Sequence, residues 1–134
     1  MKTFYFQTFT KIAVIPYIGG TIAHLLRLIY KFPLEAAPMW IHWAIVIVGG
    51  YAWIGFLLHA HNIEFKGLID KILYGLVILH LGGSIILHGY SLIVQHNNWM
   101  KIFSLEYSYF AIVYFVVLGF YCRSLSKRID AYET

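Results

Sequence analysis

The chain has 134 residues, of which 60% are hydrophobic, 19% are aromatic and only 12% are charged, and its mean hydropathy is +0.71. A soluble domain carries about 25% charged residues, so this chain has too few solvated side chains to cover a surface in water. The composition excludes a soluble domain of any size and predicts that lipid is the solvent for most of the chain. The length suits one unit, residues 1–134.

Four apolar segments follow one another along the chain, at residues 12–30, 39–60, 72–94 and 105–122. Each is close to the ~20 residues with which a helix crosses a ~30 Å hydrocarbon layer. Lipid offers no partners for open backbone groups, so the spanning segments are expected to be helical. The sequence therefore predicts an all-α, polytopic membrane four-helix bundle with up-and-down topology.

Positive charges are divided unequally between the two sides of the predicted bundle. Seven flank the side that holds both termini and the 61–71 loop: Lys2, Lys11, Lys66, Lys71, Arg123, Lys127 and Arg128. Three flank the other side: Arg27, Lys31 and Lys101. Lys and Arg are in excess on the cytoplasmic side of membrane proteins, so we expect both termini in the cytoplasm and the chain in the cytoplasmic (inner) membrane. The net charge of +4 is then explained by the excess of basic residues on the cytoplasmic side and by their contact with anionic lipid headgroups. No nucleic-acid partner is expected.

Motifs of several other protein classes are missing from the sequence. Cys122 is the only cysteine, which excludes an internal disulfide, a Cys-x-x-Cys pair and a covalently attached c-type haem. There is no phosphate-binding loop, nucleophile elbow or paired-carboxylate motif. The carboxylates stand at the ends of the predicted spans, which disfavours a proton-coupled carrier. We therefore expect that the isolated chain is not catalytic, although it could be a subunit of an oxidoreductase.

The seven histidines are the most informative residues, because ionisable groups inside a membrane are costly and usually functional. His24 and His88 each lie about six residues, roughly 9 Å, inside the outer end of their spans. His42 lies three residues into the second span, nearer the same surface. Three spans thus each bring one histidine into the outer half of the predicted bundle.

Paired glycines occur near the centres of the first three spans: Gly19-Gly20, Gly49-Gly50 and Gly82-Gly83. Small residues allow helix backbones to approach closely, which is one interpretation of these pairs. The other is that Gly20 and Gly83 leave space for a flat macrocycle. The sequence alone leaves both open.

A b-type haem is the economical explanation for several neutral imidazoles inside lipid, since the iron takes an axial nitrogen from each side. We expect His24 and His88 to be the ligands, with His42 as a substitute for either. Arg27, one helical turn outward of His24, is placed to meet a haem propionate, or else its side chain snorkels to the headgroups. Each histidine has an alternative role as a hydrogen-bonded contact between helices.

With these histidines, the glycine pairs and four spans, the chain resembles the small four-helix membrane cytochromes b, such as the haem-bearing anchor subunits of quinone-linked oxidoreductases. The resemblance covers the whole span pattern and implies electron transfer with quinone, within a larger complex of membrane subunits. The histidine spacing departs from that of two-haem members, which puts a second haem in doubt. The alternative is a non-catalytic accessory subunit whose histidines contact other helices or a partner's pigment.

A separate metal site is a further alternative. His59 and His61, with Asn62, stand at the cytoplasmic end of the second span and could hold zinc or copper. Two histidines near a loop are more often solvated, so this site is the weaker hypothesis.

Overall fold

The computed structural model describes residues 2–133, with side chains described for residues 6–128. Its α-helices are α1 (Lys2–Tyr30), α2 (Met39–Ala44), α3 (Gly50–His59), α4 (Leu68–Val94) and α5 (Tyr107–Glu133). Short helical turns lie between them: η1 (Leu34–Ala36), η2 (Ile45–Gly49), η3 (Ala60–Asn62) and η4 (Asn98–Ile102). No strand occurs in residues 2–133. The prediction of an all-α chain is confirmed.

Four helical stretches are long and apolar enough to cross a membrane: Phe6–Tyr30, Met39–Asn62, Leu68–Val94 and Tyr107–Arg128. They agree with the expectation of an integral membrane protein with four apolar helices. The first and last helices extend past the expected spans 12–30 and 105–122, since α1 begins before Lys11 and α5 continues beyond Arg123. Long basic side chains permit this, because their apolar stems lie along the helix while the charge reaches water or headgroups.

The second span is one continuous helix built from α2, η2 and α3. Its middle section, η2, is a π-helical turn. Its backbone hydrogen bonds join residues five apart, instead of four apart as in the α-helix on either side. Four β-branched residues, Ile45 to Val48, begin this turn, and Gly49 ends it. The turn changes the direction in which the preceding residues face. His42 lies on α2, directly before it.

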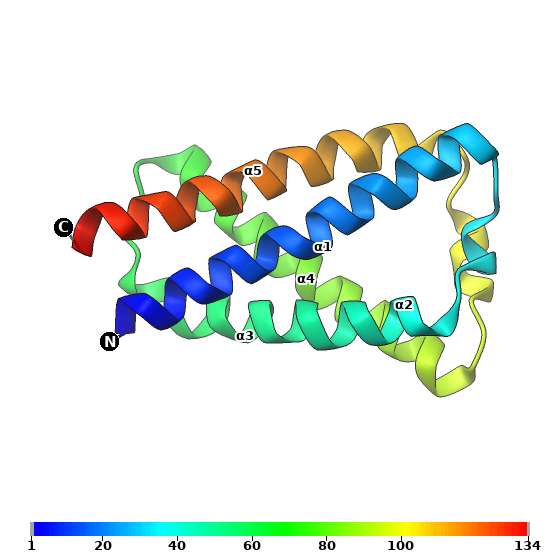
Figure 1. Ribbon diagram of the computed structural model, residues 1–134, viewed down its shortest axis with the longest axis horizontal. Helices are drawn as coiled ribbons and strands as arrows, with labels where there is room; N and C mark the ends of the chain where they lie inside the picture. The colour runs from blue at the N-terminus through cyan, green and yellow to red at the C-terminus, as the bar shows by residue number, and fades with distance from the viewer. Residues whose placement is uncertain (1, 134) are drawn as a thin grey trace.

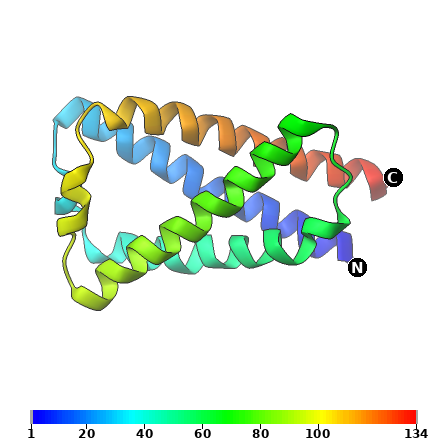
Figure 2. The same ribbon diagram turned by 180° about the vertical axis from the view of Figure 1, so that it is seen from behind.

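The helices lie in two pairs at the end of the molecule away from the termini. Figure 1 shows both termini at one end, which we call the termini end; we call the opposite end the far end. At the far end α1 lies against α5, and α2 lies against α4. Figure 2 shows α4 crossing the molecule, from the α5 side at the termini end to the α2 side at the far end.

The two helix pairs are joined across the far end by their connecting segments. η1 packs against η4, and the Asn97 side chain donates hydrogen bonds to the carbonyls of Ala37 (2.8 Å) and Glu35 (3.3 Å). α1 and α4 both end on a residue in the left-handed conformation, Lys31 (φ 57°) and Gln95 (φ 58°), which turns the chain sharply out of the helix.

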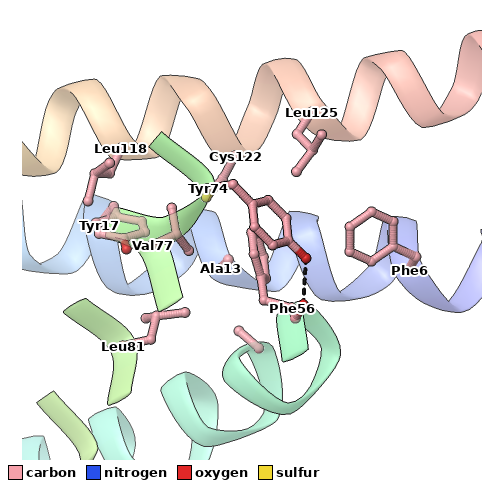
Figure 3. Close-up of a cluster of buried hydrophobic side chains, with 11 residues drawn as sticks. Phe6, Ala13, Tyr17, Phe56, Tyr74, Val77, Leu81, Leu118, Cys122 and Leu125 are labelled. Atoms are coloured by element: carbon pink, nitrogen blue, oxygen red, sulfur yellow. Dashed lines mark hydrogen bonds between the residues drawn. The ribbon is translucent and has the colours of Figure 1, made fainter. Parts of the chain in front are cut away.

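The apolar core fills the half of the molecule nearer the termini. Figure 3 shows Tyr17, Phe56, Val77 and Leu118 among its members, with the Tyr74 hydroxyl donating to the carbonyl of Phe56. Large apolar side chains elsewhere on the helices are exposed on the outside of the molecule, as expected for surfaces in contact with lipid. The far half contains hydrogen bonds between buried polar side chains as well as aromatic ring contacts.

Candidate functional site

Two of the three outer histidines are in contact in the far half. Nδ1 of His42 lies 2.6 Å from Nδ1 of His88, and the ring centroids are 4.9 Å apart. The pair joins α2 to α4, and the His42 side chain is fully buried. His24 is not part of this pair and contacts α5 instead. The structure thus brings together a different pair from the expected His24 and His88.

The contact between His42 and His88 requires a single proton between two ring nitrogens. One Nδ1 must carry the proton and donate it, while the other accepts. The remaining ring nitrogens have different surroundings. Nε2 of His42 is buried without a hydrogen-bond partner, whereas Nε2 of His88 has no partner among the described residues and is not fully enclosed.

The segments at the far end cover this histidine pair. Trp99 places its ring edge-on against His88, with centroids 5.6 Å apart, and its Nε1 donates to the Ser91 hydroxyl. Asn97 lies beside His42, and its Oδ1 is a second buried polar atom without a hydrogen-bond partner. The polar groups of His42 and Asn97 therefore lie next to each other in the interior of the far half.

His24 lies in a second polar cluster, between α1 and α5. Its Nδ1 is 2.9 Å from the Ser108 hydroxyl, and Arg27 donates to the same hydroxyl at 3.0 Å. Nε2 of His24 has no hydrogen-bond partner among the described residues and is not fully enclosed. The serine therefore fixes the orientation of the imidazole through one nitrogen and leaves the other available.

Arg27 is buried, with only 5% of its surface exposed. It donates to the carbonyls of Phe103 and Ser104, each at 2.8 Å, in addition to Ser108. Its Nε is buried without a partner, and no carboxylate of the described side chains forms an ion pair with it. This arrangement differs from a side chain that snorkels to the headgroups. A buried guanidinium is costly in lipid unless hydrogen bonds and nearby negative charge offset its desolvation.

Three residues in these contacts had no expected role: Ser108, Asn97 and Tyr17. Ser108 was recognisable as a polar residue inside an apolar run, but its partners depend on how α5 is rotated about its axis. Tyr17 lies at the centre of the bundle, where its hydroxyl is 3.2 Å from Nδ1 of His80 and its ring stacks on the imidazole. Ser84 lies 3.4 Å from the other nitrogen of His80. His80 thus bridges α4 and α1.

The two glycines expected at a cofactor have different environments. A Cβ atom on Gly20 would lie 2.7 Å from the Phe115 ring, so this glycine permits close packing of α1 and α5. A Cβ atom on Gly83 would have no described neighbour within 4 Å. Gly83 therefore leaves open space beside α4, while the space beside Gly20 is filled.

The two histidines at the end of the second span have different surroundings. The His59 ring packs on Phe6, with centroids 4.9 Å apart, and His61 is exposed. Among the described side chains, no three His, Cys, Asp or Glu residues lie close enough to hold a metal ion together.

The geometry offers two imidazoles, on α1 and α4, that are each oriented through Nδ1 and available through Nε2. It also places the buried Arg27 guanidinium, which forms no ion pair with a described carboxylate, beside one of them. The two imidazoles belong to separate contacts, since His24 faces Ser108 on α5 and His88 faces His42 on α2. No protein-family model, curated protein or solved structure matches the chain.

Proposed function

We propose that the chain is a membrane subunit that binds one b-type haem in its far half and carries electrons to or from quinone within a larger complex. One observation carries this proposal. His24 and His88 stand on different helices, and each uses Nδ1 for a contact with the protein while Nε2 has no partner.

This arrangement suits metal ligation for a chemical reason. A histidine that binds a metal nearly always uses its second ring nitrogen in a hydrogen bond, which fixes the tautomer and the ring orientation. Ser108 provides that bond for His24, and His42 provides it for His88. In this proposal His42 orients a ligand, although it remains the substitute if His88 does not bind iron.

The surroundings also suit a flat, apolar ring with anionic edges. A Cβ atom on Gly83 would meet no described neighbour within 4 Å, and the Arg27 guanidinium forms no ion pair with a carboxylate among the described residues. Propionates near Arg27 would place negative charge directly beside the guanidinium. When bound, a haem supplies one-electron transfer; the chain orients the imidazoles, balances charge and excludes water behind Trp99 and Asn97.

The wider assignment follows from the chain as a whole. We propose an up-and-down bundle in the cytoplasmic membrane, with both termini in the cytoplasm, because seven basic residues flank that side and three the other. The connecting segments are short and contain no assembled catalytic group. Partner membrane subunits would therefore supply the chemistry on the substrate, and quinone is the electron carrier that the resemblance implies.

A second candidate function is a non-catalytic accessory subunit. It is favoured by the observation that His24, His42, His80 and His88 all contact a neighbouring helix. Contacts between helices are sufficient to explain why polar residues persist in apolar spans. In this alternative the histidines fix the packing of the bundle and no cofactor is bound.

An absorption spectrum of the purified protein, prepared with haem available, distinguishes the two functions. The haem proposal predicts a sharp α-band in the reduced-minus-oxidised spectrum. Replacement of either ligand, His24→Ala or His88→Ala, should abolish haem retention, whereas the exposed control His61→Ala should retain it. A colourless wild-type protein would favour the accessory subunit. Haem that survives loss of both His24 and His88 would refute the ligand assignment.

A conservative substitution separates ligation from folding. His24→Met keeps an axial ligand, so haem should remain bound while the midpoint potential rises, because methionine ligation raises the potential of a haem. An unchanged potential would show that residue 24 does not bind iron. Far-UV circular dichroism of each variant confirms that the helices persist.

A further inference from the structure

A basic cavity lies at the termini end, between α1 and α5, far from the histidine clusters. It has a volume of about 370 Å³ and is lined by Lys11, Val14, Arg123, Ser126 and Lys127. The described side chains that line it include three cations and no carboxylate. Its volume lies in the range of pockets that hold small molecules, roughly 300–1,000 Å³.

The spacing of residues on two helices produces this cavity. Lys11 and Val14 are three residues apart on α1, and Arg123, Ser126 and Lys127 are three and four residues apart on α5, so each set shares one helix face. α1 and α5 pack closely along their length, and Gly119 lies against Tyr17. In that antiparallel register Lys11 comes opposite residues 123–127.

Three cations held around one cavity repel one another unless an anion lies between them. The side chains of Lys11, Arg123 and Lys127 are exposed, so they can reach a ligand without unfolding of either helix. Ser126 is buried and offers a hydroxyl in the cavity wall. A phosphate group, with several acceptor oxygens and negative charge, matches such a set of donors.

The surfaces that continue from the cavity towards the membrane centre are apolar. Ile15 and Ile18 follow Lys11 on the same face of α1 and are 57% and 54% exposed. Phe120 lies one turn from Arg123 on α5 and is 68% exposed. A ligand that used both regions would need an anionic head and long apolar tails. Inorganic phosphate has no tails and would use the cations alone.

From these observations we infer that the cavity binds the phosphate group of an anionic phospholipid from the leaflet on the termini side. Lys11, Arg123 and Lys127 bind the headgroup, and the acyl chains lie along Ile15, Ile18 and Phe120. Basic pockets between membrane helices are known to hold such headgroups. The inference does not depend on the haem proposal, since the two sites share no residue and lie in opposite halves of the molecule.

Native mass spectrometry of the purified full-length chain tests this inference, with phosphatidylglycerol as the anionic probe and phosphatidylcholine as the zwitterionic one. The wild type should retain phosphatidylglycerol in preference to phosphatidylcholine. The triple variant Lys11→Gln, Arg123→Gln, Lys127→Gln should bind phosphatidylglycerol more weakly by a factor on the order of a hundred. This factor follows because each basic residue near a membrane surface contributes about 1 kcal/mol to binding of anionic lipid.

A matched variant controls for total charge. Lys66→Gln, Lys71→Gln, Lys101→Gln removes the same charge from exposed positions outside the cavity and should retain the lipid like the wild type. Equal loss in both variants, or equal retention of both lipids, would overturn the site. Displacement of the lipid by millimolar inorganic phosphate would overturn the lipid assignment in favour of a free anion.

Discussion

Arg27 holds the end of α1 against the beginning of α5. Its guanidinium donates to Phe103, Ser104 and Ser108, which belong to the last residues of the connection and the first turn of α5. Ser108 in turn holds His24. A single buried side chain thus fixes both the entry of α5 and the orientation of an imidazole.

We predict that Arg27→Ala lowers the free energy of unfolding by about 3 kcal/mol or more, because each hydrogen bond from a charged group contributes roughly 1.5–3 kcal/mol. Arg27→Lys should recover only part of this, since an ammonium lacks the planar fork that reaches several acceptors. Unfolding in detergent with increasing SDS measures both values. The exposed Lys31→Ala serves as the control, with an expected change within about 0.5 kcal/mol; an Arg27→Ala protein as stable as this control would contradict the role of Arg27.

The positions of the histidines could be predicted from the sequence, but their partners could not. The depth of a residue follows from its distance to the end of its span, because each residue adds about 1.5 Å. The direction in which it faces depends on helix rotation, and a π-helical turn directly after α2 alters that rotation for His42. His42 therefore meets His88, while His24 faces Ser108. The ligand pair His24 and His88 stays a prediction for the spectrum to test.

At the level of elements, the close approach of α1 and α3 depends on one glycine. Gly55 is buried, and a Cβ atom built on it would lie 2.0 Å from the Phe9 ring. Phe9 also packs on Tyr51, with ring centroids 4.6 Å apart. The ring cannot be displaced without loss of this contact, so the glycine sets the distance between the two helices.

Gly55→Ala should therefore destabilise the bundle by about 1–3 kcal/mol, the usual cost of excess volume in a packed interior. Gly75→Ala is the matched control. A Cβ atom there has no described neighbour within 4 Å, so the variant should be neutral or more stable by up to about 1 kcal/mol through its helix propensity. The two variants are compared by their thermal unfolding midpoints, with size-exclusion chromatography used to measure the protein that stays folded after heating. Equal stability of the variants would show that Phe9 moves aside.

The number and type of the elements could be predicted because hydropathy alone specifies them. Apolar runs of about 20 residues have the length of a spanning helix, whereas a spanning strand needs only about 9–11 residues. The ends of α1 and α5 lie further out than expected, since Lys11 and Arg123 do not stop a helix whose basic side chains extend to the interface. The π-helical turn has no signal in composition, because it exchanges one backbone hydrogen-bond pattern for another within the same apolar run.

For the whole molecule, the interior divides into an apolar half at the termini end and a polar half at the far end. The apolar half contains the core of Figure 3, and an ion pair between Asp70 and Arg128, 2.8 Å apart, ties the start of α4 to α5 at the same end. The polar half contains the two histidine clusters. If the positive side faces the cytoplasm, the basic lipid cavity lies in the inner leaflet and the proposed haem lies near the outer surface.

That orientation can be measured with cysteines introduced on a Cys122→Ala background, which removes the buried native thiol. Ala36→Cys and Glu64→Cys are both exposed, at opposite ends of the molecule, and neither removes a basic residue. With seven basic residues on one side and three on the other, the positive-inside tendency predicts that a membrane-impermeant maleimide labels Ala36→Cys in intact spheroplasts. It should label Glu64→Cys only in inverted vesicles. The reverse pattern would place both termini outside and the histidine clusters near the cytoplasm, so that electrons would be exchanged with partners on the other side of the membrane.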